Sequence, residues 1–212
     1  MNRLSEIAES LQRGEDARVD ELTRLAIDEG LEARSILDDG LIAGMAVVGE
    51  RFKAHEIFLP EVLLAARAMY AGMDRLKPLL IRDGIPSLGK VVIGSVQGDL
   101  HDIGKNLVGI MLKGAGYEVI DLGNDVAPER FVETALAEEA TIIGMSALLT
   151  TTMPVMRRVV ELARERGGGR IRTIIGGAPV SAEYAREIGA DAYAFDAANA
   201  TDEVKRLLAA VG

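Results

Sequence analysis

A single histidine stands where it could bind a metal ion or a proton. Residues 91–96 form an apolar run typical of a buried strand, and a polar loop containing Gly98 and Gly104 follows it. In that loop Asp99 precedes His101 by two residues, so its carboxylate could hold one ring nitrogen while the other faces outward. This arrangement suits one bond to a metal ion.

The sequence offers few other metal ligands. An isolated metal site needs about three or four protein ligands. The chain has no cysteine, and its only other histidine, His55, falls in a different expected domain, where we expect it to be a solvated loop residue. A macrocycle that brings its own equatorial nitrogens would complete the coordination. A capped loop with a satisfied histidine is the alternative that the short motif leaves open.

Strand and helix patterns alternate from Lys90 onward. Strands are expected at 90–96, 118–122, 141–146, 172–175 and 191–195, and helices near 104–114, 128–138, 153–166, 181–188 and 201–210. These five units predict an α/β fold with a doubly wound parallel sheet, Rossmann-like, in the flavodoxin-like order 2-1-3-4-5. The crevice would open at the carboxyl ends of strands one and three, which carry the His101 loop and the segment after Ser146.

Polar and small residues follow the third and fourth expected strands. Thr150 to Thr152, taken alone, are typical of a solvated loop and a helix N-cap ahead of Pro154. Gly176 and Gly177 either form a tight turn or let the backbone approach a ligand closely, because no Cβ intervenes.

Helical patterns without strand alternation fill the first part of the chain. Apolar residues at three-to-four spacing mark four helices, at about 4–11, 19–27, 36–52 and 62–80, which predicts a small bundle. Pro60 could open the fourth helix at its first position. The helical period stops within 77–89, which is rich in proline and glycine. We therefore expect a helical bundle over 1–83, a linker over 84–89 and an α/β domain over 90–212.

Composition narrows the function classes. The 212 residues are 49% hydrophobic, which excludes disorder, and the net charge of −9 argues against nucleic acid or an anionic membrane as a partner. The absence of cysteine excludes iron-sulfur clusters, zinc-thiolate sites and disulfides, and it fits a reducing cytoplasm. No apolar run approaches the roughly 20 residues that span a bilayer, and the N-terminus does not resemble a signal peptide. We expect a soluble, cytoplasmic protein.

The loop after the first strand resembles a known signature. Its Asp-x-His-x-x-Gly pattern is similar to that of cobalamin-binding domains, in which the histidine replaces the cofactor's own benzimidazole as lower axial ligand of cobalt. The longer string resembles the methyl-transferring branch, namely cobalamin-dependent methionine synthase and the free-standing corrinoid proteins of methyltransferase systems. The string reads Gly98-Asp99-Leu100-His101-Asp102-Ile103-Gly104-Lys105-Asn106. The resemblance spans the chain from about Leu31 onward.

The resemblance implies a set of site residues. His101 would be the cobalt ligand, with Asp99 and Thr152 as its proton relay, although Thr152 stands where methionine synthase has a serine. The element from Ser146 to Leu148 would line a slot for the nucleotide tail, and the loop after the fourth strand would form its wall. The expected cofactor-binding residues of the α/β domain are Gly98, Asp99, Leu100, His101, Asp102, Ile103, Gly104, Ser146, Leu148, Thr150, Thr152, Gly176, Gly177, Ala178, Asp196 and Ala197.

The helical part adds two expected contacts. Phe58-Leu59-Pro60-Glu61 resembles the cap module that covers the upper face of methylcobalamin in the same families. A hydrophobic staple at the start of the fourth helix is the other interpretation of Phe58 and Leu59, and both can hold.

The family implies a methyl carrier that binds cobalamin, as methylcobalamin or a related corrinoid, base-off and His-on. Its expected partners are a substrate-specific methyltransferase, a second methyltransferase acting on tetrahydrofolate or a thiol, and a reductive activator, so the chain would not be catalytic alone. A cobalamin-dependent sensor and the small subunit of an adenosylcobalamin mutase are the alternatives. A flavin would leave the Asp99 and His101 pair unexplained, and the glycine turn of a nicotinamide site is absent. The methyl donor stays open.

Overall fold

The computed structural model describes residues 2–209, and the chain divides into two compact units. The first holds the residues up to Pro86 together with 114–116, and the second begins at Ser87 and holds the rest. The expected end of the last helix at Ala210, and the outer limits of the two expected domains at Met1 and Gly212, lie outside the described residues.

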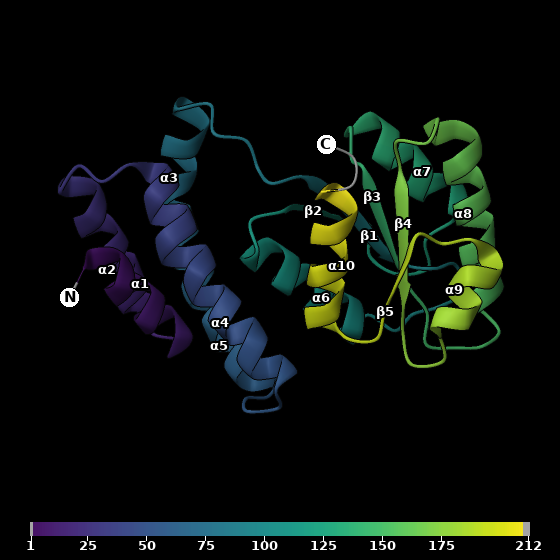
Figure 1. Cartoon of the computed structure of the whole chain (residues 1–212), viewed down its shortest axis with the longest axis horizontal. Coiled ribbons are helices and arrows are strands. Elements are labelled where there is room, and N and C mark those ends of the chain that lie inside the picture. The colour runs from purple at the N-terminus through teal and green to yellow at the C-terminus, as the bar shows by residue number, and fades with distance from the viewer. Residues whose placement is uncertain (1, 210–212) are drawn as a thin grey trace. The chain divides into compact units, whose positions relative to one another are not determined.

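The first unit is a bundle of four helical rods (Figure 1). Its elements are α1 (Arg3–Gln12), α2 (Asp16–Asp28), α3 (Ala33–Ser35), the π-helix η1 (Ile36–Ile42), α4 (Ala43–Lys53) and α5 (Leu59–Arg82). Apolar side chains at three-to-four spacing, such as Ile7, Leu22 and Leu76, are fully buried. The expected four-helix bundle is confirmed.

The third helix of the bundle, formed by α3, η1 and α4, contains a π-helical stretch that the apolar period did not predict. Ile42 keeps helical backbone angles, so η1 runs directly into α4. Two glycines of this rod lie against α1, and a Cβ on Gly44 would come within 2.9 Å of the carbonyl oxygen of Ala8. Because glycine has no Cβ, the backbone of this helix can approach α1 closely.

The ends of α5 differ from the expectation. The helix begins at Leu59, so Pro60 takes its second position, and Glu61 accepts a hydrogen bond from the backbone N–H of Phe58 at 3.1 Å. The staple positions fall on the buried Ile57 and Val62, while Phe58 is 65% exposed, so the staple interpretation of Phe58 is wrong.

The helix α5 runs through Pro78, as expected, and ends at Arg82, just beyond the expected end at Leu80. A proline inside a helix removes one backbone hydrogen bond, because it has no N–H. Leu76 and Leu80 on either side are buried in the bundle, and this packing keeps the segment helical. The helix ends where Gly84 takes a φ of +64°.

The second unit is an α/β sandwich around one parallel sheet. Its strands are β1 (Lys90–Ser95), β2 (Glu118–Asp121), β3 (Ile142–Ser146), β4 (Arg172–Gly176) and β5 (Ala192–Ala194), in the order β2-β1-β3-β4-β5. All neighbours pair in parallel, and Val92 lies opposite Ile143 in the central pair. The predicted strand order is confirmed.

Helices cover both faces of the sheet, which explains the continuous apolar runs of its strands. They are α6 (Ile103–Gly114), α7 (Pro128–Ala137), α8 (Met153–Gly167), α9 (Ala182–Ile188) and α10 (Ala197–Ala209). In Figure 1, α6 and α10 lie on one face and α7, α8 and α9 on the other. Phe131 of α7, Met156 of α8 and Ile143 of β3 are fully buried in the core of the second face.

The last helix begins at Ala197 rather than at the expected Thr201. Asp196 accepts a hydrogen bond from the backbone N–H of Asn199 at 2.7 Å, and Asn199 accepts one from the backbone N–H of Phe195 at 3.3 Å. This reciprocal cap starts the helix earlier than its apolar period indicates.

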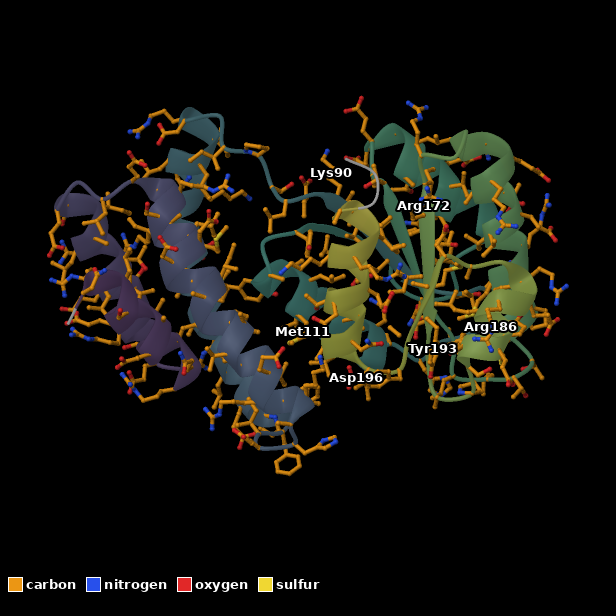
Figure 2. The ribbon with its side chains drawn as sticks, in the orientation of Figure 1. Lys90, Met111, Arg172, Arg186, Tyr193 and Asp196 are labelled. Carbon is orange, nitrogen blue, oxygen red and sulfur yellow. The ribbon has the colours of Figure 1, made fainter. Side chains whose placement is uncertain are left out.

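The strand ends define two edges of the sheet. Lys90 and Arg172 begin β1 and β4 at the upper edge in Figure 2, whereas Asp196, which follows β5, lies at the lower edge. The carboxyl ends of the strands, and therefore the His101 loop, belong to this lower edge.

Candidate functional site

The loop after β1 turns sharply and buries one carboxylate. Gly98 has a φ of +84°, and the backbone N–H of Asp99 donates to the carbonyl of Val96 at 3.0 Å. This turn directs the side chain of Asp99 into the protein, where its exposed fraction is 0%. A buried carboxylate requires several hydrogen-bond donors.

Both carboxylate oxygens of Asp99 find such donors. Oδ1 accepts from the backbone N–H of His101 at 3.0 Å and lies 2.8 Å from His101 Nδ1. Oδ2 accepts from the backbone N–H groups of Leu148 at 2.7 Å and Leu149 at 3.2 Å. It also accepts from Thr152 Oγ1 at 2.9 Å. Asp99 therefore joins the loop after β1 to the loop after β3.

These donors control the charge of Asp99. Burial favours the neutral acid, but the hydrogen bonds from Leu148, His101 and Thr152 outweigh it and hold the pKa of Asp99 well below its usual range. The group is ionised at neutral pH and can only accept hydrogen bonds.

An ionised Asp99 fixes the ring of His101. Because the carboxylate cannot donate, Nδ1 must carry the proton that forms the 2.8 Å contact, which leaves a lone pair on Nε2 of the neutral ring. The side chain of His101 is 53% exposed, and its backbone carbonyl accepts from Ser95 Oγ at 2.6 Å. The ring thus presents a single nitrogen ligand outward.

Thr152 has a choice of acceptors. Its hydroxyl lies 2.9 Å from Asp99 Oδ2 and 2.9 Å from the carbonyl oxygen of Leu149, and it carries only one proton. The structure brings the expected relay residues His101, Asp99 and Thr152 into one continuous chain of contacts.

The other expected residues of the α/β unit gather at the same edge. Leu100 and Ile103 beside His101 are 69% and 74% exposed, and Leu148 in the facing loop is 44% exposed. Such large apolar side chains left in water around one histidine indicate an apolar ligand. The remaining expected residues stand at the strand ends or just after them: Gly98, Asp102, Gly104, Ser146, Thr150, Gly176, Gly177, Ala178, Asp196 and Ala197. Phe58 and Leu59 belong to the helical unit, and so does His55, which is exposed.

The paired glycines at the end of β4 are explained by contacts within the chain. Gly177 has a φ of +123°, and a Cβ there would lie 1.9 Å from the carbonyl oxygen of Ala147. A Cβ on Gly176 would lie 2.9 Å from the carbonyl oxygen of Ala194. The approach of the neighbouring strand ends is therefore sufficient reason for glycine at both positions.

The central strand carries a feature that the sequence analysis missed. Gly144 and Ser146 of β3 are only partly buried in the middle of the sheet. A Cβ on Gly144 would lie 3.2 Å from Ile93, whose own side chain packs against Gly109 of α6. Small residues therefore leave part of β3 accessible on the face that α6 and α10 cover. The glycine in a buried strand pattern was the available signal.

Comparison with known proteins decides the family. Residues 89–205 match a family model described as B12 binding domain, and residues 3–77 match a second model with the same description. The chain is 41% identical over 212 aligned residues to a corrinoid protein of Desulfitobacterium hafniense, with 98% of each chain covered. The chain belongs to the corrinoid-protein family. It is a B12-binding protein, and its cofactor is cobalamin.

Further relatives and solved structures extend this assignment. The chain is 46% identical over 181 residues to dimethylamine corrinoid protein 1 of Methanosarcina acetivorans, covering 84% of this chain and 85% of the relative. It matches a structure of the methanol:cobalamin methyltransferase complex from Methanosarcina barkeri with a TM-score of 0.87 and 32% identity, over 98% of this chain and 80% of the other. A cobalamin-binding protein from Desulfitobacterium hafniense matches with a TM-score of 0.78 and 31% identity, over 96% and 97%.

The site fits this cofactor. Among residues 2–209, no three His, Cys, Asp or Glu side chains gather as a metal site, so His101 can offer one bond to a metal that brings its other ligands. Gly104 stands in the first turn of α6, where a Cβ would meet no atom within 4 Å. Neither packing nor backbone strain explains a glycine there, although it costs a helix about 0.5–1 kcal/mol. It leaves room for a ligand beside the His101 loop.

Proposed function

We propose that this chain is a corrinoid methyl carrier that binds cobalamin base-off and His-on through His101 Nε2. The observation that carries the proposal is the 2.8 Å contact of His101 Nδ1 with the buried, ionised Asp99, which leaves Nε2 as the free nitrogen. Metal-binding histidines are commonly oriented in this way.

The relatives support a role in methyl transfer. Those named above include a dimethylamine corrinoid protein, and one matched structure is a methyltransferase complex. We infer that this chain serves a substrate-specific methyltransferase, a second methyltransferase acting on tetrahydrofolate or a thiol, and a reductive activator, all in the cytoplasm. Among the described residues, no helix has the length and apolar character needed to cross a membrane.

The residues of the chain would tune the cofactor. Bound cobalamin would supply the cobalt that accepts and passes on a methyl group. His101 Nε2 would hold the metal, with Asp99 fixing the ring from Nδ1. When Nε2 is released it can take a proton, and Asp99 would stabilise the resulting imidazolium at Nδ1. Thr152 can move its hydroxyl proton between Asp99 and the carbonyl of Leu149, which adjusts the charge that Asp99 presents.

The helical unit would act as a cap over the reactive face of the cofactor. Phe58 is 65% exposed at the start of α5, and Leu63 and Leu64 on the same helix are 46% and 44% exposed. These apolar side chains could exclude water from a bound methyl group, with Leu59 beside them.

A transfer assay tests the carrier role. The protein is loaded with methylcobalamin and mixed with a thiol acceptor, with and without a second methyltransferase that acts on thiols. We expect methyl loss only when the methyltransferase is present. Transfer at an enzymatic rate by the protein alone would contradict the carrier role. A light-dependent change of oligomeric state, without any response to methyltransferases, would favour the sensor instead.

A further inference from the structure

Lys105 is a buried cation that the proposed axial ligation does not use. It stands in the first turn of α6, and its side chain is 4% exposed. Nζ contacts both carboxylate oxygens of Asp121 at 2.6 Å and Asn106 Oδ1 at 2.7 Å. These three acceptors match the three protons of the ammonium group. Lysine is seldom buried without such pairing.

Asp121 has a second role at the end of β2. Its Oδ1 also accepts from the backbone N–H of Gly123 at 2.9 Å, which shapes the segment that follows. We call residues 121–126 the β2 bracket. Its backbone runs beside the end of β1: Ser95 N–H donates to the carbonyl of Gly123 at 3.0 Å, and Val126 N–H donates to the carbonyl of Ser95 at 3.0 Å.

The β2 bracket holds the His101 loop from one side. Asp125 accepts from the backbone N–H of Gly98 at 2.7 Å, and its own N–H donates to the carbonyl of Asp99 at 3.0 Å. Asn124 Nδ2 donates to the carbonyl of Leu100 at 3.2 Å. Asp125 has a φ of +53°, a conformation that persists only where surrounding contacts fix it.

The His101 loop is therefore anchored twice. The side chain of Asp99 ties it to the loop after β3, and the β2 bracket holds its backbone at Gly98, Asp99 and Leu100. His101 lies between these anchors and the start of α6. Lys105 closes the frame, because it joins the first turn of α6 to Asp121.

We propose that Lys105 is a positioning residue for His101 and acts through Asp121 and the β2 bracket. This inference rests on the proposed function, in which His101 is the axial ligand. Without the ammonium group, Asp121 keeps its charge but loses its cation, and the β2 bracket loses its link to α6. The ring of His101 would then sample directions away from the metal.

The test compares Lys105→Met with Lys105→Arg and with Asp191→Asn. Lys105→Met keeps the length of the side chain and removes its charge, whereas Lys105→Arg can still pair with both oxygens of Asp121. Asp191 is a matched control in the same unit, since its carboxylate accepts from Thr173 N–H at 2.8 Å and pairs with Arg172 at the other edge of the sheet.

Two readouts are used. In the protein without cofactor, hydrogen exchange reports the amides of Gly98 and Asp125, which form the β2 bracket contacts. In the full chain made with ¹⁵N-labelled histidine, loaded with cobalamin and reduced to cobalt(II), electron paramagnetic resonance reports the share of cobalt that shows doublet splitting from a histidine nitrogen. For Lys105→Met we expect about tenfold faster exchange at these amides and about a tenfold lower ratio of His-on to His-off cobalt. Lys105→Arg and Asp191→Asn should keep both near the wild type.

The following outcomes would contradict either this inference or the proposed function. A Lys105→Met variant that loses thermal stability as Asp191→Asn does, yet keeps its nitrogen splitting, would overturn the inference even if exchange became faster. An equal decrease in the ratio of His-on to His-off cobalt in Lys105→Arg and Lys105→Met would also overturn it. If Lys105→Met does not fold, Asp121→Asn replaces it in the test. This variant keeps an acceptor for the N–H of Gly123 and removes the ion pair, so it must lower the ratio of His-on to His-off cobalt. A wild type without splitting from a histidine nitrogen would instead overturn the proposed function. Hydrogen exchange would in that case still test whether Lys105 stabilises the β2 bracket.

Discussion

Asp99 is the residue on which the site converges, because its two oxygens serve two different loops. One oxygen faces the histidine that follows it, and the other faces donors about fifty residues later in the chain, at Leu148, Leu149 and Thr152. The motif predicted the first contact from spacing alone. The second depends on the pairing of β1 with β3. The predicted strand order placed the two loops at one crevice and the resemblance pointed to Thr152, but neither predicted the backbone donors Leu148 and Leu149.

Asp99→Asn should destabilise the α/β unit by about 1–3 kcal/mol, since its amide NH₂ must face N–H or O–H donors on one side. Asp102→Asn removes the same charge from the same loop and serves as the control. Chemical unfolding of the protein without cofactor measures both. Equal stability of the two variants would show that the Asp99 contacts contribute little.

Thr152→Val should weaken the coupling of the loops only modestly. Asp99 Oδ2 keeps the backbone donors Leu148 and Leu149, so we expect a loss of about 0.5–1.5 kcal/mol in unfolding free energy. Thr152→Ser should match the wild type because it keeps the hydroxyl. The pH at which His101 leaves the metal, followed in the visible spectrum, should shift in Thr152→Val and not in Thr152→Ser. No shift in either variant would remove Thr152 from the relay.

At the scale of elements, periodicity predicted most of the fold, because apolar faces dictate helices and strands. It failed where packing or capping overrode the pattern. A π-helical stretch interrupts the third helix of the bundle, and the Asp196 and Asn199 cap starts α10 early. The ion pair of Lys105 with Asp121 joins a helix to the neighbouring strand, so no local spacing could reveal it.

Gly104→Ala tests whether Gly104 serves the stability of α6 or the binding of the cofactor. Nothing in the structure meets a Cβ at this position, and alanine favours helices, so the protein without cofactor should gain up to about 1 kcal/mol of stability. Cobalamin retention should fall because the space beside the His101 loop shrinks. Lys113→Ala, at an exposed position near the end of α6, is the control, and equilibrium dialysis measures retention. Undiminished retention in Gly104→Ala would show that Gly104 does not face the cofactor.

At the scale of the whole molecule, the chain consists of two units, each with its own core. Each unit matches a family model described as B12 binding domain. The sequence predicted the helical bundle and the parallel sheet. The cap role of Phe58 and Leu59 was expected only from the resemblance and stays a prediction, because an exposed side chain shows its role only against a bound ligand.

A chain that begins at Ser87 should still bind cobalamin through His101. It should photolyse methylcobalamin faster than the full chain, because radicals would no longer be held under an apolar cap. Phe58→Ser in the full chain, which replaces one exposed ring, should give an intermediate rate. Equal photolysis rates in the full and shortened chains would contradict the cap role.

The central claim is that His101 Nε2 is the axial ligand of the cobalt. The most direct measurement is electron paramagnetic resonance of the cobalt(II) form after the protein is made with ¹⁵N-labelled histidine. The account predicts nitrogen splitting that changes from triplets to doublets on labelling, and these doublets disappear in His101→Ala but not in His55→Ala. Triplets that persist in the labelled wild type, or doublets that survive in labelled His101→Ala, would contradict it.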